Sequence, residues 1–257
     1  MQKRRADLDS LDQRWAKLSP HVRLIGPADE TPRPLAILLH GCGGVQSHLD
    51  DYAARAVAAG WRAAILDSYG PRGWSRAFGL SLVCSGMTFW GAERAGDILA
   101  ALHGLSARPD VDAGRVALAG WSHGGWAIMD LMTMPLLRDE EARVAGAAPA
   151  LLDGVKGLFL VYPYVGFGSR SRHRPWVRSP AVTGIIAARD HLGKPALHEA
   201  AYASARAGGC EVETVTLDAT HAFDQPDEPL LAVSPMRRDP ALTEDSLDRM
   251  ERFLAGL

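Results

Sequence analysis

The stretch that decides the fold is Val116-Ala-Leu-Ala-Gly120-Trp-Ser122-His-Gly-Gly125. It opens with a short apolar run, which is typical of a strand buried on both faces of a sheet. The run ends in a Gly-x-Ser-x-Gly pattern, which places a serine on a sharp turn between a strand and a helix. Helical periodicity follows from Ala127 to Leu136. This segment therefore predicts a strand, a tight turn and a helix, with the Ser122 hydroxyl projecting from the end of a sheet.

The rest of the chain repeats this alternation of strand and helix. Apolar runs that predict further strands lie at residues 35–39, 61–66, 155–161, 182–188 and 212–217. Stretches with helical spacing lie at residues 47–59, 93–105, 195–207 and 242–254. Because the connections are short, we predict an α/β fold with one mostly parallel, doubly wound sheet and helices on both of its faces.

Length and composition fit one globular domain. The chain has 257 residues, of which 47% are hydrophobic and 23% are charged, and this composition excludes a disordered or collagen-like chain. A chain of about 250 residues can bury one large core. Residues 1–20 are polar with some helical spacing, so we expect a loosely attached amino-terminal helix there, followed by a single domain over residues 21–257.

Charge and hydropathy give no reason to expect a nucleic acid or a membrane as partner. The formal net charge is −2, and no apolar run approaches the 18 or so residues that a membrane helix needs. The stretch Met1–Asp9 is charged and lacks the apolar core of a secretory signal. We therefore expect a cytoplasmic protein, a monomer or a homodimer, that acts on a small molecule.

The three cysteines, Cys42, Cys84 and Cys210, are few and odd in number. Such a count favours reduced thiols in a reducing compartment. One disulfide with a spare thiol is the alternative, and the sequence does not say which two cysteines would pair.

Polar residues follow the predicted strands and predict where chemistry takes place. In an open parallel sheet, ligands bind outside the carboxyl ends of the strands, where we expect His40, Ser122, Asp190 and His221. A serine hydroxyl needs a base, and the base needs an orienting acid. We predict Ser122 as nucleophile, His221 as base and Asp190 as acid. Asp218 is the weaker candidate for the acid, because it lies only three residues before His221.

A tetrahedral intermediate at Ser122 would need N–H donors for its oxyanion. The residue after the nucleophile supplies one, the backbone N–H of His123. The glycine-rich loop after residue 39 can approach a substrate closely, and we assign the second donor to the N–H of Cys42, with Gly43 as the alternate. The His40 side chain fits a structural role under this loop.

Six residues after strand ends are candidates for a substrate pocket: Tyr69, Arg72, Trp74, Trp121, Tyr162 and Tyr164. Aromatic rings there would hold an apolar acyl or aryl group, or would simply pack the top of the sheet. Arg72 either pairs with a substrate carboxylate or is an exposed loop arginine. No cluster has zinc-ligand spacing and no Gly-x-Gly-x-x-Gly follows the first strand, so we expect neither a metal nor a nucleotide cofactor.

Six motifs make the sequence resemble the dienelactone hydrolase family of α/β-hydrolases. They follow the family's order over roughly residues 30 to 255: Leu39-His-Gly-Cys-Gly-Gly44, Asp67-Ser-Tyr-Gly-Pro-Arg-Gly73, Gly120-Trp-Ser-His-Gly-Gly125, Tyr162-Pro-Tyr164, Arg189-Asp-His191 and Thr220-His-Ala-Phe-Asp224. The resemblance implies a serine- or cysteine-dependent hydrolase of carboxylic esters or lactones that uses no metal or cofactor. The dienelactone hydrolases proper carry cysteine at the nucleophile position, whereas this chain has Ser122, so the resemblance does not carry dienelactone itself over as substrate.

Two other functions compete with ester hydrolysis. A peptidase of the prolyl-oligopeptidase type would use the same sheet and the same order of serine, acid and histidine, but it usually has a further domain that restricts access. A binding protein with a vestigial site would be expected to lack one of the three residues, and none is missing here.

Overall fold

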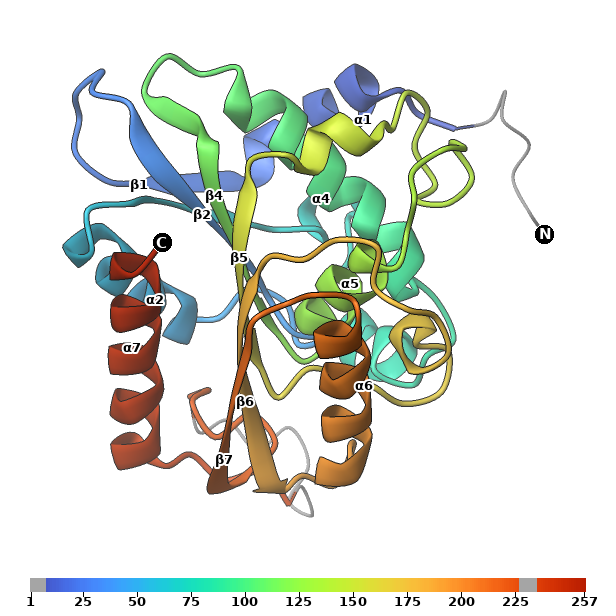
Figure 1. Cartoon of the computed structure of the whole chain (residues 1–257), viewed down its shortest axis with the longest axis vertical. Helices are drawn as coiled ribbons and strands as arrows, with labels where there is room; N and C mark the ends of the chain where they lie inside the picture. Colours follow the sequence, from blue (N-terminus) through green and yellow to red (C-terminus); the bar gives the residue numbers. More distant parts are fainter. Residues whose placement is uncertain (1–7, 227–234) are drawn as a thin grey trace.

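Seven strands form one sheet in the order β1-β3-β2-β4-β5-β6-β7 (Figure 1). This computed structural model describes residues 8–226 and 235–257. The strands are β1 (Val22–Ile25), β2 (Arg33–Leu39), β3 (Arg62–Leu66), β4 (Val111–Trp121), β5 (Val155–Val161), β6 (Ala181–Arg189) and β7 (Val212–Thr220). β1 pairs antiparallel with β3, and the other neighbouring strands pair in parallel. The predicted α/β architecture is confirmed, and the edge strand β1 was missed because four half-exposed residues carry too weak a pattern.

Helices cover both faces of the sheet. They are α1 (Leu11–Leu18), α2 (His48–Ala58), α4 (Gly91–Ser106), α5 (His123–Met132), α6 (Pro195–Ala207) and α7 (Pro240–Ala255), with the short turn α3 (Arg76–Phe78) between β3 and α4. Figure 1 shows α2 and α7 on one side of the sheet and α4, α5 and α6 on the other. The apolar side chains form one buried cluster on each side.

The central strands are apolar throughout because both of their faces are buried. In β2, the side chains of Leu35, Ile37 and Leu39 belong to the cluster with α4 and α5. Those of Ala36 and Leu38 belong to the cluster with α2 and α7. Alternate residues of a strand point to opposite faces, so a strand covered on both sides reads as a continuous apolar run.

The amino-terminal helix α1 is packed firmly, contrary to the expectation of loose attachment. Ser10 caps it, and Gln13 completes a reciprocal capping box. Leu18 is completely buried, and the Arg14 guanidinium donates a hydrogen bond of 2.8 Å to Asp97 of α4. Amphipathic spacing predicts the helix but does not show what covers its apolar face. Residues 1–7 of the predicted lead-in lie outside the described part of the chain.

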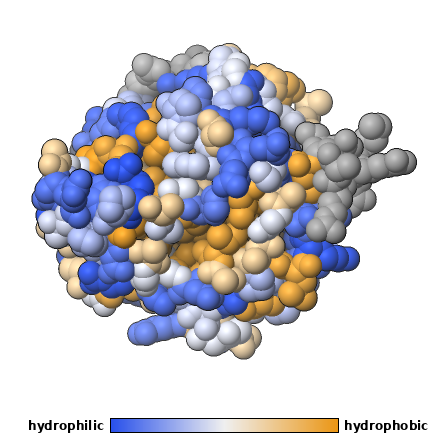
Figure 2. Space-filling model, turned by 90° about the horizontal axis from the view of Figure 1, so that it is seen from above, coloured by the Kyte–Doolittle hydropathy of each residue, from blue (hydrophilic) through white to orange (hydrophobic). Residues whose placement is uncertain are grey.

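The surface mixes hydrophilic and apolar residues. Figure 2 looks from above the view of Figure 1 and shows apolar residues gathered near the middle of that face, with hydrophilic residues around them. Among the described residues, none of the helices combines the length and the apolar character that a membrane crossing requires.

A disulfide joins Cys42 to Cys84, which corrects the expectation of reduced thiols. Cys42 lies in the loop after β2, and Cys84 directly follows the π-helical turn η4 (Gly79–Val83). Their Cα atoms are 5.3 Å apart although the two residues are 42 positions apart in the chain. Cysteine count alone does not reveal this approach, because the folding of residues 70–86 brings the two together. Cys210 is a buried free thiol, and burial raises its pKa to about 11.

We predict that reduction of this disulfide lowers the free energy of unfolding by about 2–4 kcal/mol, since the bridge closes a loop of more than 40 residues in the unfolded chain. Urea unfolding with and without dithiothreitol measures the change. The Cys84→Ser variant is the matched control, and its unfolding should equal that of the reduced protein and be insensitive to the reductant. Equal stability of the wild type in both conditions would refute the pairing.

Candidate active site

Ser122 lies on a strained turn between β4 and α5. Its backbone has φ 49° and ψ −109°, a conformation that costs free energy for a residue with a side chain. The turn is so tight that a Cβ on Gly120 would come within 2.6 Å of the Gly125 nitrogen. A Cβ on Gly124 would come within 2.2 Å of the Leu39 carbonyl oxygen. The glycines of the motif are therefore required by contact between main chains.

The structure brings Ser122, His221 and Asp190 into one hydrogen-bonded chain. The His221 ring lies 2.9 Å from Ser122 Oγ through Nε2 and 2.7 Å from Asp190 Oδ2 through Nδ1. Because an ionised carboxylate only accepts, Nδ1 carries the proton and Nε2 accepts from the serine hydroxyl. These residues follow β4, β6 and β7 at the carboxyl edge of the sheet, where each was predicted.

Asp190, and not Asp218, is the carboxylate that reaches the imidazole. The Asp190 side chain is 1% exposed, whereas that of Asp218 is 84% exposed and pairs with Arg189. Burial raises the pKa of Asp190, but the hydrogen bond and charge of His221 and the N–H of Leu192 outweigh burial, so its pKa lies below the ordinary value. The acid is therefore ionised at neutral pH and favours a protonated partner.

The two predicted oxyanion donors flank Ser122. Gly41 packs against the serine, since a Cβ at Gly41 would lie 3.5 Å from Ser122 Cβ. The N–H of the adjacent Cys42 has no hydrogen bond within the described part of the chain. His123 is the first residue of α5, where main-chain N–H groups lack acceptors inside the helix. Neither N–H group has a hydrogen-bond acceptor among the described residues.

Trp121 and Tyr162 lie in the core and do not line a pocket. Both are completely buried, and both donate hydrogen bonds to Asp224, Trp121 through Nε1 at 2.9 Å and Tyr162 through its hydroxyl. Tyr52 of α2 is a third donor to the same carboxylate, at 2.9 Å. Of the two interpretations made from the sequence, burial therefore supports packing at the top of the sheet for Trp121 and Tyr162.

Arg72 faces inward and forms a bidentate ion pair with Asp97 of α4, so neither interpretation made from the sequence describes it. Tyr69 is buried, and its hydroxyl donates to the Cys42 carbonyl at 2.9 Å. Trp74 stacks on Phe78. The polar groups of Arg72 and Tyr69 are therefore bound within the protein.

Tyr164 is a pocket candidate with a half-buried side chain beside the turn at Ser122. Its N–H donates to the Ser122 carbonyl at 3.0 Å, and its half-buried ring packs against Trp126. Farther out, the exposed rings of Trp90 and Phe167 contact each other edge to face. Trp90 and Phe167 were not predicted, because an exposed aromatic residue in a loop has no periodic signal.

Asp130 of α5 anchors the segment of residues 169–171. One carboxylate oxygen accepts the main-chain N–H groups of Arg170 and Ser171, and the other accepts Trp126 Nε1. Burial raises the pKa of Asp130 to about 7 despite these donors. A carboxyl with a raised pKa holds its proton in the folded state at pH values where the unfolded chain has released it.

We predict that Asp130 makes the folded state less stable as pH rises from about 4 to about 7, because the folded protein binds the proton that the unfolded chain loses. The difference in unfolding free energy between wild type and Asp130→Asn should therefore shift in favour of Asn from pH 5 to pH 7.5. Urea unfolding at both pH values measures it, with Asp218→Asn as the exposed control. A difference independent of pH would contradict the prediction.

The described residues contain no group of three or more His, Cys, Asp or Glu side chains placed to hold a metal ion.

The sequence analysis missed two buried residues behind the site, Asp224 and Arg94. Their motif and helix positions are visible in the sequence, but a polar residue in an otherwise amphipathic helix or in a loop is ordinarily assigned to the surface.

Residues 21–257 match the model of the dienelactone hydrolase family. The chain belongs to this family. It is therefore a hydrolase that acts on ester bonds, with the fold of the α/β-hydrolases. A search of curated protein sequences finds no significant match.

Solved structures that share this fold include three hydrolases. A dienelactone hydrolase-like promiscuous phosphotriesterase from metagenomic libraries has a TM-score of 0.69 and 19% identity, with 92% of each chain covered. A putative dienelactone hydrolase from Klebsiella pneumoniae has a TM-score of 0.62 and 18% identity, again with 92% of each chain covered. The propionate-bound esterase 2 of Thermogutta terrifontis has a TM-score of 0.64 and 15% identity, over 91% of this chain and 88% of that one.

Proposed function

We propose that this member of the dienelactone hydrolase family hydrolyses carboxylic ester or lactone bonds through an acyl-enzyme on Ser122. The observation that carries the proposal is the hydrogen-bonded chain from Asp190 through His221 to Ser122 Oγ. This arrangement supplies a nucleophile, a base in hydrogen-bond contact with it and a buried acid that fixes the tautomer of the base. Every step below uses groups of the protein and water only.

Acylation begins when Ser122 Oγ attacks the substrate carbonyl and passes its proton to His221 Nε2. The carbonyl oxygen becomes an oxyanion, which the N–H groups of Cys42 and His123 stabilise. Asp190 stabilises the imidazolium that forms. His221 then donates the proton to the leaving alkoxide as the carbon–oxygen bond breaks, so an alcohol departs and the acyl group remains on Ser122. With a lactone as substrate, the alcohol would stay joined to the acyl group on Ser122.

Deacylation repeats these steps with water as the nucleophile. His221 takes a proton from the water, whose oxygen attacks the acyl carbonyl, and the same two N–H groups hold the second oxyanion. Collapse of this intermediate returns the proton to Ser122 Oγ and releases a carboxylic acid. The base therefore ends each cycle neutral and ready for the next substrate.

The substrate side of the site combines aromatic surface with few free charges. Tyr164, Trp90 and Phe167 offer apolar area on the loops after β5 and before α4. Arg72 is already paired with Asp97 and is not free to bind a substrate carboxylate. We therefore propose uncharged esters or lactones with apolar groups as the preferred class. One structural neighbour, the Thermogutta esterase, is described as phosphylated by tabun, sarin and paraoxon, which recommends organophosphorus probes for the test.

We predict that a fluorophosphonate probe labels the wild type and that Ser122→Ala abolishes both labelling and hydrolysis of p-nitrophenyl acetate. The reason is that only the hydroxyl activated by His221 reacts at neutral pH. Gel-based labelling and release of p-nitrophenol measure the two effects. Ser179→Ala, at an exposed serine just before the amino end of β6, is the control and should behave as wild type. Folded wild type that neither labels nor hydrolyses any ester would favour a binding protein.

We predict that Asp190→Asn lowers kcat about 10³–10⁴-fold, because an amide cannot hold the imidazole in the required tautomer or stabilise the imidazolium. Asp218→Asn is the matched control, since this exposed carboxylate lies near the end of β7, three residues before His221, and pairs with Arg189, and its kcat should be unchanged. Equal effects of the two substitutions on kcat would contradict the assignment.

A substrate panel separates ester hydrolysis from peptide hydrolysis. We expect turnover of p-nitrophenyl esters of graded chain length and of simple lactones, and no turnover of proline p-nitroanilides. Comparison of kcat/KM across the panel measures specificity as differential stabilisation of the transition state. Preference for the anilides would instead support a peptidase.

A further inference from the structure

We propose that Arg94 is a positioning residue that ties together the two halves of the oxyanion site and sets a buried positive charge behind them. This inference rests on the proposed function and assigns a further residue a role in the same reaction. Arg94 lies in the first turn of α4, and the proposed mechanism does not use its side chain.

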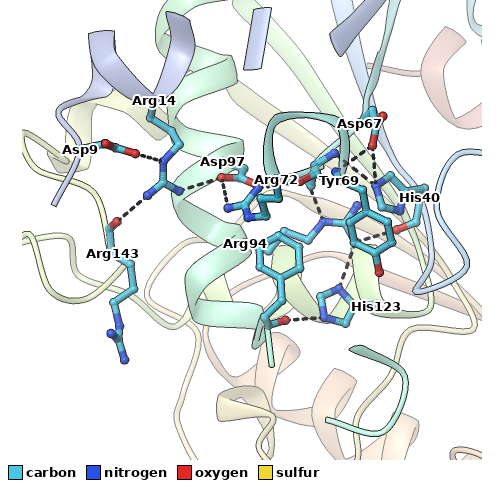
Figure 3. A network of polar contacts seen from close by, with 12 residues as sticks. Asp9, Arg14, His40, Asp67, Tyr69, Arg72, Arg94, Asp97, His123 and Arg143 are labelled. Carbon is cyan, nitrogen blue, oxygen red and sulfur yellow. Dashed lines mark hydrogen bonds and ion pairs between the residues drawn. The ribbon is translucent and has the colours of Figure 1, made fainter. Parts of the chain in front are cut away.

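One nitrogen of the Arg94 guanidinium contacts both segments that supply the oxyanion donors. Nη1 donates to the His40 carbonyl at 2.7 Å and contacts His123 Nδ1 at 3.0 Å, as Figure 3 shows. His40 opens the loop that carries the Cys42 N–H, and His123 supplies the other N–H from its own main chain. Arg94 Nε also donates a hydrogen bond of 3.2 Å to Ser68 Oγ, which further holds the guanidinium in place.

Both histidines are held neutral with defined tautomers. His123 Nε2–H donates to the Phe89 carbonyl at 2.7 Å, so Nδ1 is free to accept from Arg94. Burial and the Arg94 charge lower the pKa of His123 to about 3. His40 Nδ1–H donates to the Gly41 carbonyl at 2.6 Å, and burial holds its pKa well below the ordinary value. A neutral ring at residue 123 is required, because a protonated one would repel the guanidinium.

The Arg94 charge has no carboxylate partner in the described part of the chain. The side chain is completely buried, and Nη2 makes no hydrogen bond to the described residues. Asp97, one turn along α4, binds Arg14 and Arg72 instead (Figure 3). Burial accordingly lowers the pKa of Arg94, to about 10, yet the group stays charged at neutral pH. The charges of Asp97 and Asp67 act on the guanidinium only from a distance, and a buried cation without a carboxylate in contact costs folding free energy.

Negative charge that develops at the oxyanion site would supply a counter-ion that the described residues do not place in contact with Arg94. The tetrahedral intermediate places such a charge between the N–H groups of Cys42 and His123, and a low-dielectric interior strengthens its attraction to a fixed cation. The neutral ester in the ground state gains little from the same charge. The consequence is a contribution to kcat with little effect on KM.

The test compares Arg94→Met with Arg14→Met on p-nitrophenyl acetate. Arg14 is the control, because it is a half-buried arginine on the same side of the sheet that binds Asp97 of α4 and makes no hydrogen bond to either half of the oxyanion site within the described residues. We expect Arg94→Met to lower kcat about 10- to 100-fold with KM within about threefold of wild type, and to slow fluorophosphonate labelling in parallel. The midpoint of the pH profile of kcat should not move, since His221 is untouched. Arg14→Met should keep the kcat of wild type.

Folded Arg94→Met with kcat within about twofold of wild type would overturn the proposal, as would a shifted pH midpoint, which would mean action through His221. Arg94→Lys covers failure of the methionine variant to fold, because it keeps the charge but cannot bridge His40 and His123 with a planar fork. It should lower kcat by about threefold or more, and a wild-type kcat would refute the bridge. Loss of the proposed function itself has a separate signature, the absence of ester hydrolysis by the wild type.

Discussion

The rest of the site depends on the turn at Ser122. A residue with φ 49° stays in place only because main-chain contacts on all sides leave no alternative. Gly120 and Gly124 allow the strand, the loop after β2 and α5 to approach within van der Waals contact of one another. The same turn sets the serine hydroxyl above the sheet and aims the first N–H groups of α5 at the place where a carbonyl oxygen would bind. In the proposed mechanism, the geometry that positions Ser122 therefore also supplies part of the oxyanion site.

Two buried polar networks hold the turn from opposite sides of the sheet. On the side of α2 and α7, Asp224 accepts hydrogen bonds from Trp121 and Tyr162 and lies three residues after His221, so the histidine loop is tied to the ends of β4 and β5. On the side of α4, Arg94 links His40 with His123. Burying each network costs free energy. The first network holds the loop that carries His221, and the second holds the segments of His40 and His123, which the proposed chemistry needs in fixed positions.

The candidate catalytic residues and the exposed aromatic residues lie on different parts of the fold. Ser122, Asp190 and His221 lie at the carboxyl ends of strands. The aromatic residues Trp90, Tyr164 and Phe167 lie on connections between strands and helices. The disulfide between Cys42 and Cys84 couples the two parts, since it fastens the oxyanion loop to one of these connections.

The sequence by itself determined the alternation of strands and helices, the nucleophile turn and the chain order of serine, acid and histidine. These features are local, because an apolar run, a glycine spacing or a residue just after a strand is legible without knowing its neighbours in space. The short edge strand β1, the tight packing of α1 and the disulfide were decided only by the tertiary structure. The tertiary structure also decided that the side chains of Trp121, Arg72 and Arg94 point into the protein. The physical reason is that burial of a polar or aromatic side chain depends on partners supplied by distant segments: Asp224 for Trp121, Asp97 for Arg72, and His40 with His123 for Arg94.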